Sequence, residues 1–187
     1  MQKKIILASQ SPRRKQLLEW AEVDFDVIVS DADESFPLGL SFSEIAIHIA
    51  KNKASVIKNS KGDEMPILAA DTIVVCNDKV IGKPKDREDA IKIIAELSGN
   101  THEVITGVAL LYLGNETLFS DTTTVSFHEL TQAQIEFYVD KYKPYDKAGA
   151  YAIQEWIGVV GISSIQGDFY NVMGLPISRV VKALSTL

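Results

Sequence analysis

A strand buried on both faces is predicted by the run ILAADTIVVC at residues 67–76, in which β-branched and apolar side chains predominate. Asn77 and Asp78 follow as a hairpin turn into a short strand at residues 79–81. Apolar runs elsewhere predict strands at residues 5–8, 25–29, 102–113, 117–127 and 158–165, with a second hairpin across Gly114 and Asn115.

Helices are predicted where a capping residue precedes apolar residues at helical spacing. Ser11 followed by Pro12 begins a helix that runs to about residue 20. Ser41 and Glu44 form a capping box for a helix that reaches about residue 59. Further helices are predicted after Asp86, after Thr131 with Gln134, and from Pro176 to Leu184.

The order of these elements predicts the fold class. Strands and helices alternate, and two hairpins require antiparallel pairs, so we expect an α/β fold with a mixed β-sheet flanked by helices. No repeat or linker rich in Pro, Gly or Ser marks a boundary along the chain. A single domain over residues 1–187 is therefore expected.

The composition of the 187-residue chain excludes several classes of protein. Lys and Arg number 19 and Asp and Glu 25, so the net charge of −6 disfavours a dedicated nucleic-acid binder. A single cysteine excludes an internal disulfide and a cysteine-rich zinc site. The longest apolar run, residues 108–113, is far below the roughly 18 residues that cross a bilayer. We expect a cytoplasmic protein without stable binding to a membrane or nucleic acid.

Common nucleotide-binding and hydrolase motifs are missing from the sequence. Gly82 and Lys83 are followed by Pro84 rather than Ser or Thr, which excludes a Walker A loop. No G-x-G-x-x-G occurs, and residues 161–165 lack the second glycine of the G-x-S-x-G elbow. The sequence thus lacks the motifs that would be the main evidence for a P-loop enzyme, a Rossmann cofactor site or α/β-hydrolase chemistry.

An anion site is one interpretation of the segment between the first predicted strand and helix. Ser9, Ser11, Arg13 and Arg14 supply hydroxyls and guanidinium groups beside the free N–H groups of a helix N-terminus, and all of these favour an anion. An ordinary capped helix with solvated arginines explains the same residues equally well.

Asp71 is the second candidate functional residue. It interrupts the apolar strand at residues 67–76, and a carboxylate in a buried strand must find a cation, hydrogen-bond donors or water. A structural ion pair is one explanation. Because Asp has a low β-propensity, we favour a site in which Asp71 is a metal ligand or a general base.

Two lysines and a second acidic residue extend this set. Lys53 falls at or beside the apolar face of its predicted helix, and Lys83 lies in a tight Gly-Lys-Pro turn. Each lysine alone fits a solvated side chain. Together with the arginines and the acidic pair Glu34 and Asp71, they supply cations for phosphate oxygens and carboxylates for a divalent metal and water.

Six ordered motifs span the chain from end to end. They are SQSPRR at residues 9–14, AADT at 69–72, GKP at 82–84, TGV at 106–108, DKAGAYAIQ at 146–154 and GLP at 174–176. Together they resemble the Maf family of nucleotide pyrophosphatases. The resemblance implies hydrolysis of nucleoside triphosphates to monophosphate and pyrophosphate with a divalent metal, Mg²⁺ or Mn²⁺. It also implies an elongated, inosine-triphosphatase-like fold with two lobes around a central cleft, usually in a homodimer.

The resemblance also assigns roles to single residues. The family's proton acceptor corresponds to Asp71, and Asp71 and Glu34 are the implied metal-binding carboxylates. Other positions that handle phosphate correspond to Ser9, Arg14, Lys53 and Lys83. Positions that distinguish the subfamilies correspond to Arg13, Thr72 and Gln154, which are similar to those of the branch that acts on dTTP and UTP. One departure is Asn100, where that branch often has Gln.

Two other functions remain open at this stage. One is a non-catalytic regulator of cell division that binds a protein or nucleic acid, as the family's association with septum formation suggests. Asp71 argues against it, because a binding module gains nothing from an unpaired carboxylate in a core strand. The other is a phosphatase that releases orthophosphate, and only the product distinguishes it.

Overall fold

The computed structural model describes residues 3–29 and 31–187. Its strands are β1 (Ile5–Leu7), β2 (Phe25–Val27), β3 (Ile67–Cys76), β4 (Lys79–Ile81), β5 (Thr101–Tyr112), β6 (Asn115–Phe127) and β7 (Ile162–Gln166). Its helices are α1 (Pro12–Trp20), α2 (Phe42–Lys61), α3 (Arg87–Leu97), α4 (Gln132–Tyr142), α5 (Trp156–Gly161), α6 (Phe169–Met173) and α7 (Ile177–Leu184), with one 3₁₀ turn, η1 (Ala148–Ala150). None of the helices in this part of the chain combines the length and apolar character of a membrane span.

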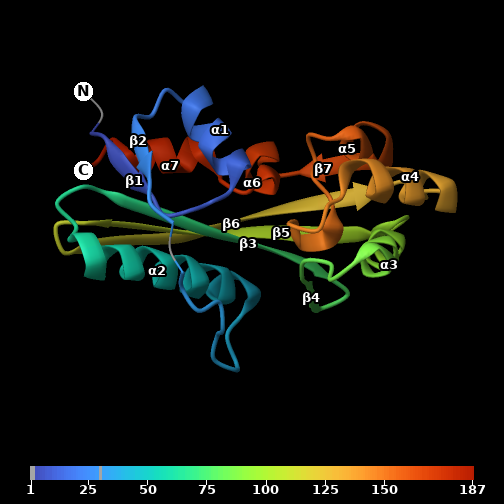
Figure 1. The fold of residues 1–187 in the computed structure, drawn as a ribbon, viewed down its shortest axis with the longest axis horizontal. Coiled ribbons are helices and arrows are strands. Elements are labelled where there is room, and N and C mark those ends of the chain that lie inside the picture. Colours follow the sequence, from blue (N-terminus) through green and yellow to red (C-terminus); the bar gives the residue numbers. More distant parts are fainter. Residues whose placement is uncertain (1–2, 30) are drawn as a thin grey trace. The chain divides into compact units, whose positions relative to one another are not determined.

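Seven strands form one mixed sheet (Figure 1). The strand order is β2-β1-β3-β5-β6-β7, and β4 pairs with β3 outside this path. β1 pairs in parallel with β2 and with β3, whereas β4 is antiparallel to β3 and β7 is antiparallel to β6. The predicted α/β fold with a mixed sheet and flanking helices is confirmed.

The predicted helix starts are also confirmed, because the expected side chains cap the free N–H groups of the first turn. Both capping boxes are present, and the capping residues of α1 to α4 are Ser11, Ser41, Asp86 and Thr131.

Some predictions were wrong. Residues 158–165 do not form one strand, because 158–161 are the end of α5. Val159 is 81% exposed there, so its β-branched side chain is not stabilised by packing in a sheet, and the segment forms a helical turn instead. The β5–β6 turn lies at Leu113 and Gly114, one residue earlier than predicted, where both residues take the positive φ of a two-residue hairpin turn. Helix α6 was not predicted.

The chain divides into two compact units. Unit 1 contains Met1–Thr72, Thr106–Asp121 and Gly174–Leu187, and unit 2 contains Ile73–Ile105 and Thr122–Met173. The long strands β3, β5 and β6 therefore each contribute residues to both units.

Within unit 1, α2 packs on one face of the sheet. Ala50, Ala54 and Ile57 of α2 form a buried cluster with residues of β1, β3 and β5, among them Ile67 and Ala69. Side chains alternate along a strand, so Asp71 lies on the same face of β3 as Ile67 and Ala69, and Thr72 lies on the other. Figure 1 shows α1 and α7 along the side of the strands opposite α2.

Within unit 2, α3 packs against α4. This unit also holds a cluster of three aromatic rings, from β5, from β6 and from the residue that follows η1. His102, Phe127 and Tyr151 contact one another edge to face, with ring centroids 5.1–5.4 Å apart. The Nε2 of His102 lies 2.7 Å from the Tyr151 hydroxyl.

Candidate active site

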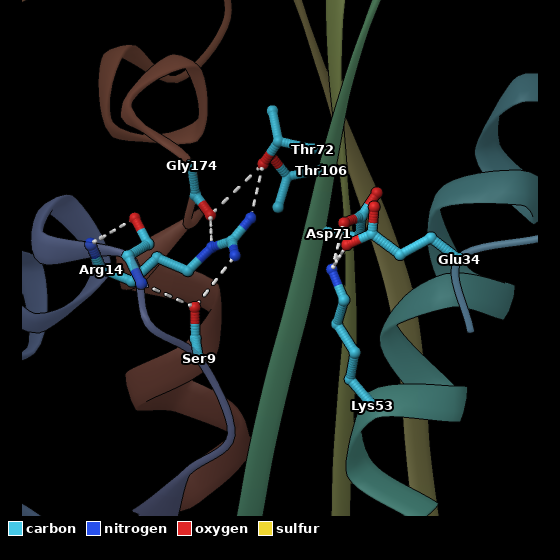
Figure 2. A network of polar contacts seen from close by, with 9 residues as sticks. Ser9, Arg14, Glu34, Lys53, Asp71, Thr72, Thr106 and Gly174 are labelled. Atoms are coloured by element: carbon cyan, nitrogen blue, oxygen red, sulfur yellow. Dashed lines mark hydrogen bonds and ion pairs between the residues drawn. The ribbon is translucent and has the colours of Figure 1, made fainter. Parts of the chain in front are cut away.

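Three charged side chains meet on the α2 face of β3 (Figure 2). The Nζ of Lys53 lies 2.7 Å from Oδ1 of Asp71 and 2.8 Å from Oε1 of Glu34. The side chains of Lys53 and Asp71 are only 15% and 14% exposed, whereas Glu34 is 54% exposed. Two carboxylates therefore share one largely buried ammonium, and Asp71 is not unpaired in this structure.

Each member of this cluster comes from a different element. Asp71 lies in the middle of β3, Lys53 on α2, and Glu34 in the loop before α2. Gly107 of β5 allows α2 to come close to the sheet, because a Cβ at this position would lie 2.2 Å from the carbonyl carbon of Ala46. The TGV motif thus sets the distance between the sheet and the helix that carries Lys53.

Arg14 forms a second cluster on the opposite face of β3 (Figure 2). Its Nε donates to the carbonyl of Gly174 at 2.7 Å, its Nη1 to Oγ of Ser9 at 3.1 Å, and its Nη2 to Oγ1 of Thr72 at 3.0 Å. The hydroxyls of Thr72 and Thr106 are 2.9 Å apart. The oxygens that accept hydrogen bonds from the guanidinium, one carbonyl and two hydroxyls, are all neutral.

The environment of Arg14 favours an anion. Burial lowers the pKa of its guanidinium to about 10, while the negative charge of Asp71 acts in the opposite direction. The group is therefore cationic at neutral pH. A guanidinium has five N–H bonds, and Arg14 uses three of them in the contacts above, so capacity for an additional acceptor remains.

The serines of the predicted anion site already accept hydrogen bonds from neighbouring backbone N–H groups. Ser11 caps α1 by accepting a hydrogen bond from the backbone N–H of Arg14, and the Oγ of Ser9 accepts one from the N–H of Ser11 at 3.2 Å. Arg13 is half-buried on α1. The capped helix and the cationic segment are thus both present.

Two residues of this cluster had been given no role from the sequence. Gly174 has a φ of +117°, which favours glycine, and its carbonyl accepts from Arg14. Thr106 is fully buried, and its hydroxyl forms a hydrogen bond with the hydroxyl of Thr72. Both lie in the motifs GLP and TGV, but sequence spacing does not reveal that these motifs meet Arg14.

The two remaining candidates, Lys83 and Gln154, belong to unit 2 and are exposed there. The backbone N–H of Gly149 donates to the carbonyl of Gly82 at 3.2 Å, which connects the turn of Lys83 to the loop that leads to Gln154. Lys147 in the same loop is buried, and its Nζ lies 2.8 Å from Asp146 and 3.7 Å from Glu155. This ion-pair network was also missed from the sequence.

The carboxylates of Glu34 and Asp71 fit a divalent metal that takes its other ligands from phosphate and water, as Mg²⁺ commonly does. Both already direct an oxygen toward one cationic group. Within residues 3–29 and 31–187, no group of three or more His, Cys, Asp or Glu side chains is placed to hold a metal. Among these residues, Glu34 and Asp71 supply two carboxylates toward a coordination shell.

Comparisons with known proteins agree with these motifs. The model of the family described as Maf-like protein matches residues 4–187. A protein of Parabacteroides distasonis named dTTP/UTP pyrophosphatase is 47% identical over 97% of this chain and 94% of its own length. A protein of Cytophaga hutchinsonii with the same name is 49% identical over 98% of this chain and 84% of its own length.

A solved structure supports the fold. The structure of a HAM1 protein from Coxiella burnetii matches with a TM-score of 0.51 and 16% sequence identity, over 99% of this chain and 100% of that chain. This likeness concerns the fold alone.

Proposed function

The chain belongs to the Maf family, and we propose that it hydrolyses dTTP and UTP to the nucleoside monophosphate and pyrophosphate. The names of the relatives that are 47% and 49% identical support this substrate choice. The observation that carries the chemistry is the largely buried Asp71, which sits in a core strand in contact with Lys53 and, through it, with Glu34.

In the proposed reaction, water attacks the α-phosphorus and transfers a proton to the carboxylate of Asp71. The oxygen of the water stays on the α-phosphorus, the bond from that phosphorus to the α,β-bridging oxygen breaks, and pyrophosphate leaves with the bridging oxygen. A carboxylate within a protein core suits this role because few waters compete for it.

Lys53 and Lys83 donate hydrogen bonds to phosphate oxygens in this proposal, which stabilises the negative charge that accumulates on the leaving group. Glu34 and Asp71 would hold Mg²⁺ or Mn²⁺, which supplies positive charge at the phosphate oxygens. Lys83 lies in unit 2, and its role follows from the family resemblance.

Ser9, Arg14, Arg13, Thr72 and Gln154 are proposed to bind the substrate. Arg14 would use its remaining N–H bonds for phosphate while it holds Ser9 and Thr72 in place. The amide of Gln154 can offer one donor and one acceptor to the edge of uracil or thymine, which presents carbonyl oxygens beside an N–H. Guanine presents a different order of donors and acceptors.

The experiment that tests the proposal is hydrolysis of UTP in ¹⁸O-labelled water with Mg²⁺. We expect UMP and pyrophosphate as products, with the label in UMP, because attack occurs at the α-phosphorus. Label in pyrophosphate would place the attack at the β-phosphorus, and release of orthophosphate would identify a different phosphatase. Absence of turnover with every nucleotide of a full panel would favour the non-catalytic regulator. The Asp71→Asn variant, purified in parallel, controls for contaminating enzymes.

We also propose that residues 1–187 act as one catalytic domain in a cytoplasmic homodimer that binds neither nucleic acid nor membranes stably. The family resemblance supports the dimer, and the net charge of −6 disfavours nucleic acid. Light scattering after size-exclusion chromatography measures the oligomeric state.

A further inference from the structure

One ammonium group contacts both of the carboxylates that are proposed to hold a divalent cation. The Nζ of Lys53 lies 2.8 Å from Oε1 of Glu34 and 2.7 Å from Oδ1 of Asp71, so both carboxylate oxygens converge on a single cation. Figure 2 shows the Lys53 side chain extending from α2 to both carboxylates. A metal bound by the same oxygens and the ammonium group would repel each other at short range.

The carboxylate pair is also an incomplete ligand set. Small divalent cations require about six oxygen ligands, and two carboxylates leave most of these positions to water and to substrate phosphates. The described residues place no third acidic, histidine or cysteine side chain beside them. Both the competition from Lys53 and the missing ligands therefore weaken metal binding by the free protein.

We propose that the ammonium group of Lys53 blocks the binding of divalent cations to Glu34 and Asp71 until a nucleoside triphosphate binds. The ammonium group of Lys53 then moves from the carboxylates to the phosphates. Metal and nucleotide then bind with positive coupling, and the free protein has only weak affinity for the metal. The inference rests on the proposed function, because it assigns the same two carboxylates to the metal.

The side chains permit this exchange. Lys53 has a flexible four-carbon stem and three donors, so its ammonium can move while α2 stays in place. Glu34 is 54% exposed and lies in a loop, so its carboxylate can adjust from the ammonium to a metal. Asp71 is held by β3 and remains the fixed member of the pair.

The test measures Mn²⁺ binding to the nucleotide-free protein by the loss of the electron paramagnetic resonance signal of free Mn²⁺. We expect Lys53→Met to bind Mn²⁺ at least about tenfold more tightly than the wild type, because the competing charge is gone. Lys51→Met is the matched control, since Lys51 lies on the same helix and pairs with Glu116 at 2.7 Å, away from the cluster. It should bind Mn²⁺ as the wild type does.

A double variant shows whether the gain involves the carboxylate pair. Adding Glu34→Gln to Lys53→Met should abolish the gain, because one of the two ligands is lost. Circular dichroism checks that each variant is folded, and Lys53→Gln replaces Lys53→Met if the latter is not. Unchanged Mn²⁺ affinity in a folded Lys53 variant would overturn the inference, as would an equal gain in Lys51→Met.

A second measurement needs no variant. By linkage, Mn²⁺ should tighten the binding of α,β-imido-UTP to the wild type by about tenfold or more relative to binding in EDTA. Equal affinity under both conditions would overturn the coupling. Pyrophosphate release from UTP is assayed separately, so failure of the inference and failure of the proposed function are distinguishable.

Discussion

The two faces of β3 carry two kinds of polar cluster, although Asp71 and Thr72 are neighbours in sequence. On the Thr72 face, a buried guanidinium is surrounded by a carbonyl and hydroxyl groups, all of them neutral acceptors. On the Asp71 face, an ammonium is shared by two carboxylates, one of which lies on an exposed loop.

This difference indicates that the two faces of β3 have different roles. Directional hydrogen bonds from Arg14 connect α1, β3 and Gly174, so the Thr72 face behaves as a rigid support. Ion pairs around Lys53 are less directional and their partners can be exchanged for other charges, which suits chemistry with phosphate and metal. Changes on the Asp71 face should therefore alter activity more than stability, whereas changes on the Thr72 face should lower stability as well as substrate binding.

Asp71→Asn should produce the largest effect. The amide cannot accept a proton from water, so we expect kcat to fall by about 10²- to 10⁴-fold. Asn can still accept a hydrogen bond from Lys53, and Glu34 still supplies a negative charge to that ammonium, so the free energy of unfolding should fall by less than the roughly 3–5 kcal/mol that loss of a buried ion-pair partner costs. Pyrophosphate release and urea denaturation measure the two quantities. A folded variant with near wild-type turnover would remove Asp71 from the mechanism.

Arg14→Met should lower stability as well as phosphate binding. The variant removes the three hydrogen bonds that the guanidinium donates to Ser9, Thr72 and Gly174, and a hydrogen bond to a charged group contributes about 1.5–3 kcal/mol, so the free energy of unfolding should drop by about 3 kcal/mol or more. Lys15→Met on the same helix is the control and should be close to neutral. Equal stability of both variants in urea would show that the Arg14 cluster is not a rigid support.

His102 in unit 2 extends the comparison to a buried base that is kept neutral. Burial lowers the pKa of His102 to about 4, and its Nδ1 has no hydrogen-bond partner among the described residues. The unfolded chain therefore binds a proton at higher pH than the folded protein does, so stability falls as the pH drops from about 6.5 to 4, by up to about 3 kcal/mol.

The His102 contribution is isolated by comparison with His102→Phe, because carboxylates titrate in the same pH range. The Phe variant should lose less stability over this pH interval than the wild type, as measured by denaturation at a series of pH values. Parallel pH profiles of the two proteins would contradict the prediction.

Gly107→Ala probes the packing that supports the Asp71 face. Its Cβ would lie 2.2 Å and 2.3 Å from backbone atoms of Ala46 and Ile47, so α2 must shift, at a cost of about 1–3 kcal/mol. Turnover should fall as well, because α2 carries Lys53. Gly82→Ala is the control for stability, since no atom lies within 4 Å of its added Cβ. A stable and active Gly107→Ala variant would show that the close approach is dispensable.

Gln154→Glu should have the smallest effect and lies outside both clusters. We expect kcat/KM for dTTP and UTP to fall by roughly tenfold, about 1.4 kcal/mol, because a charged acceptor replaces the amide donor at the base. Gln166→Glu, at an exposed position of β7, is the control. Unchanged preference among nucleotides would show that Gln154 does not read the base.

Local sequence patterns predicted the parts of the fold that depend on local chemistry. The capping residues of α1 to α4 and the hairpin after β3 follow from side chains within a few positions, so they were predicted correctly. The strand predicted over residues 158–165 failed because burial, which the local pattern does not reveal, determines whether β-branched residues enter a sheet.

The order of residues along the chain was enough to identify the family motifs and the anomalous Asp71 in an apolar strand. It did not reveal that Lys53 lies between Asp71 and Glu34, or that Gly174 and Thr106 complete the cluster of Arg14. These contacts join residues up to 160 positions apart, and they depend on the pleat of β3 and on how closely α2 packs. Sequence therefore predicts which groups are available, whereas packing determines which of them share a charge or a hydrogen bond.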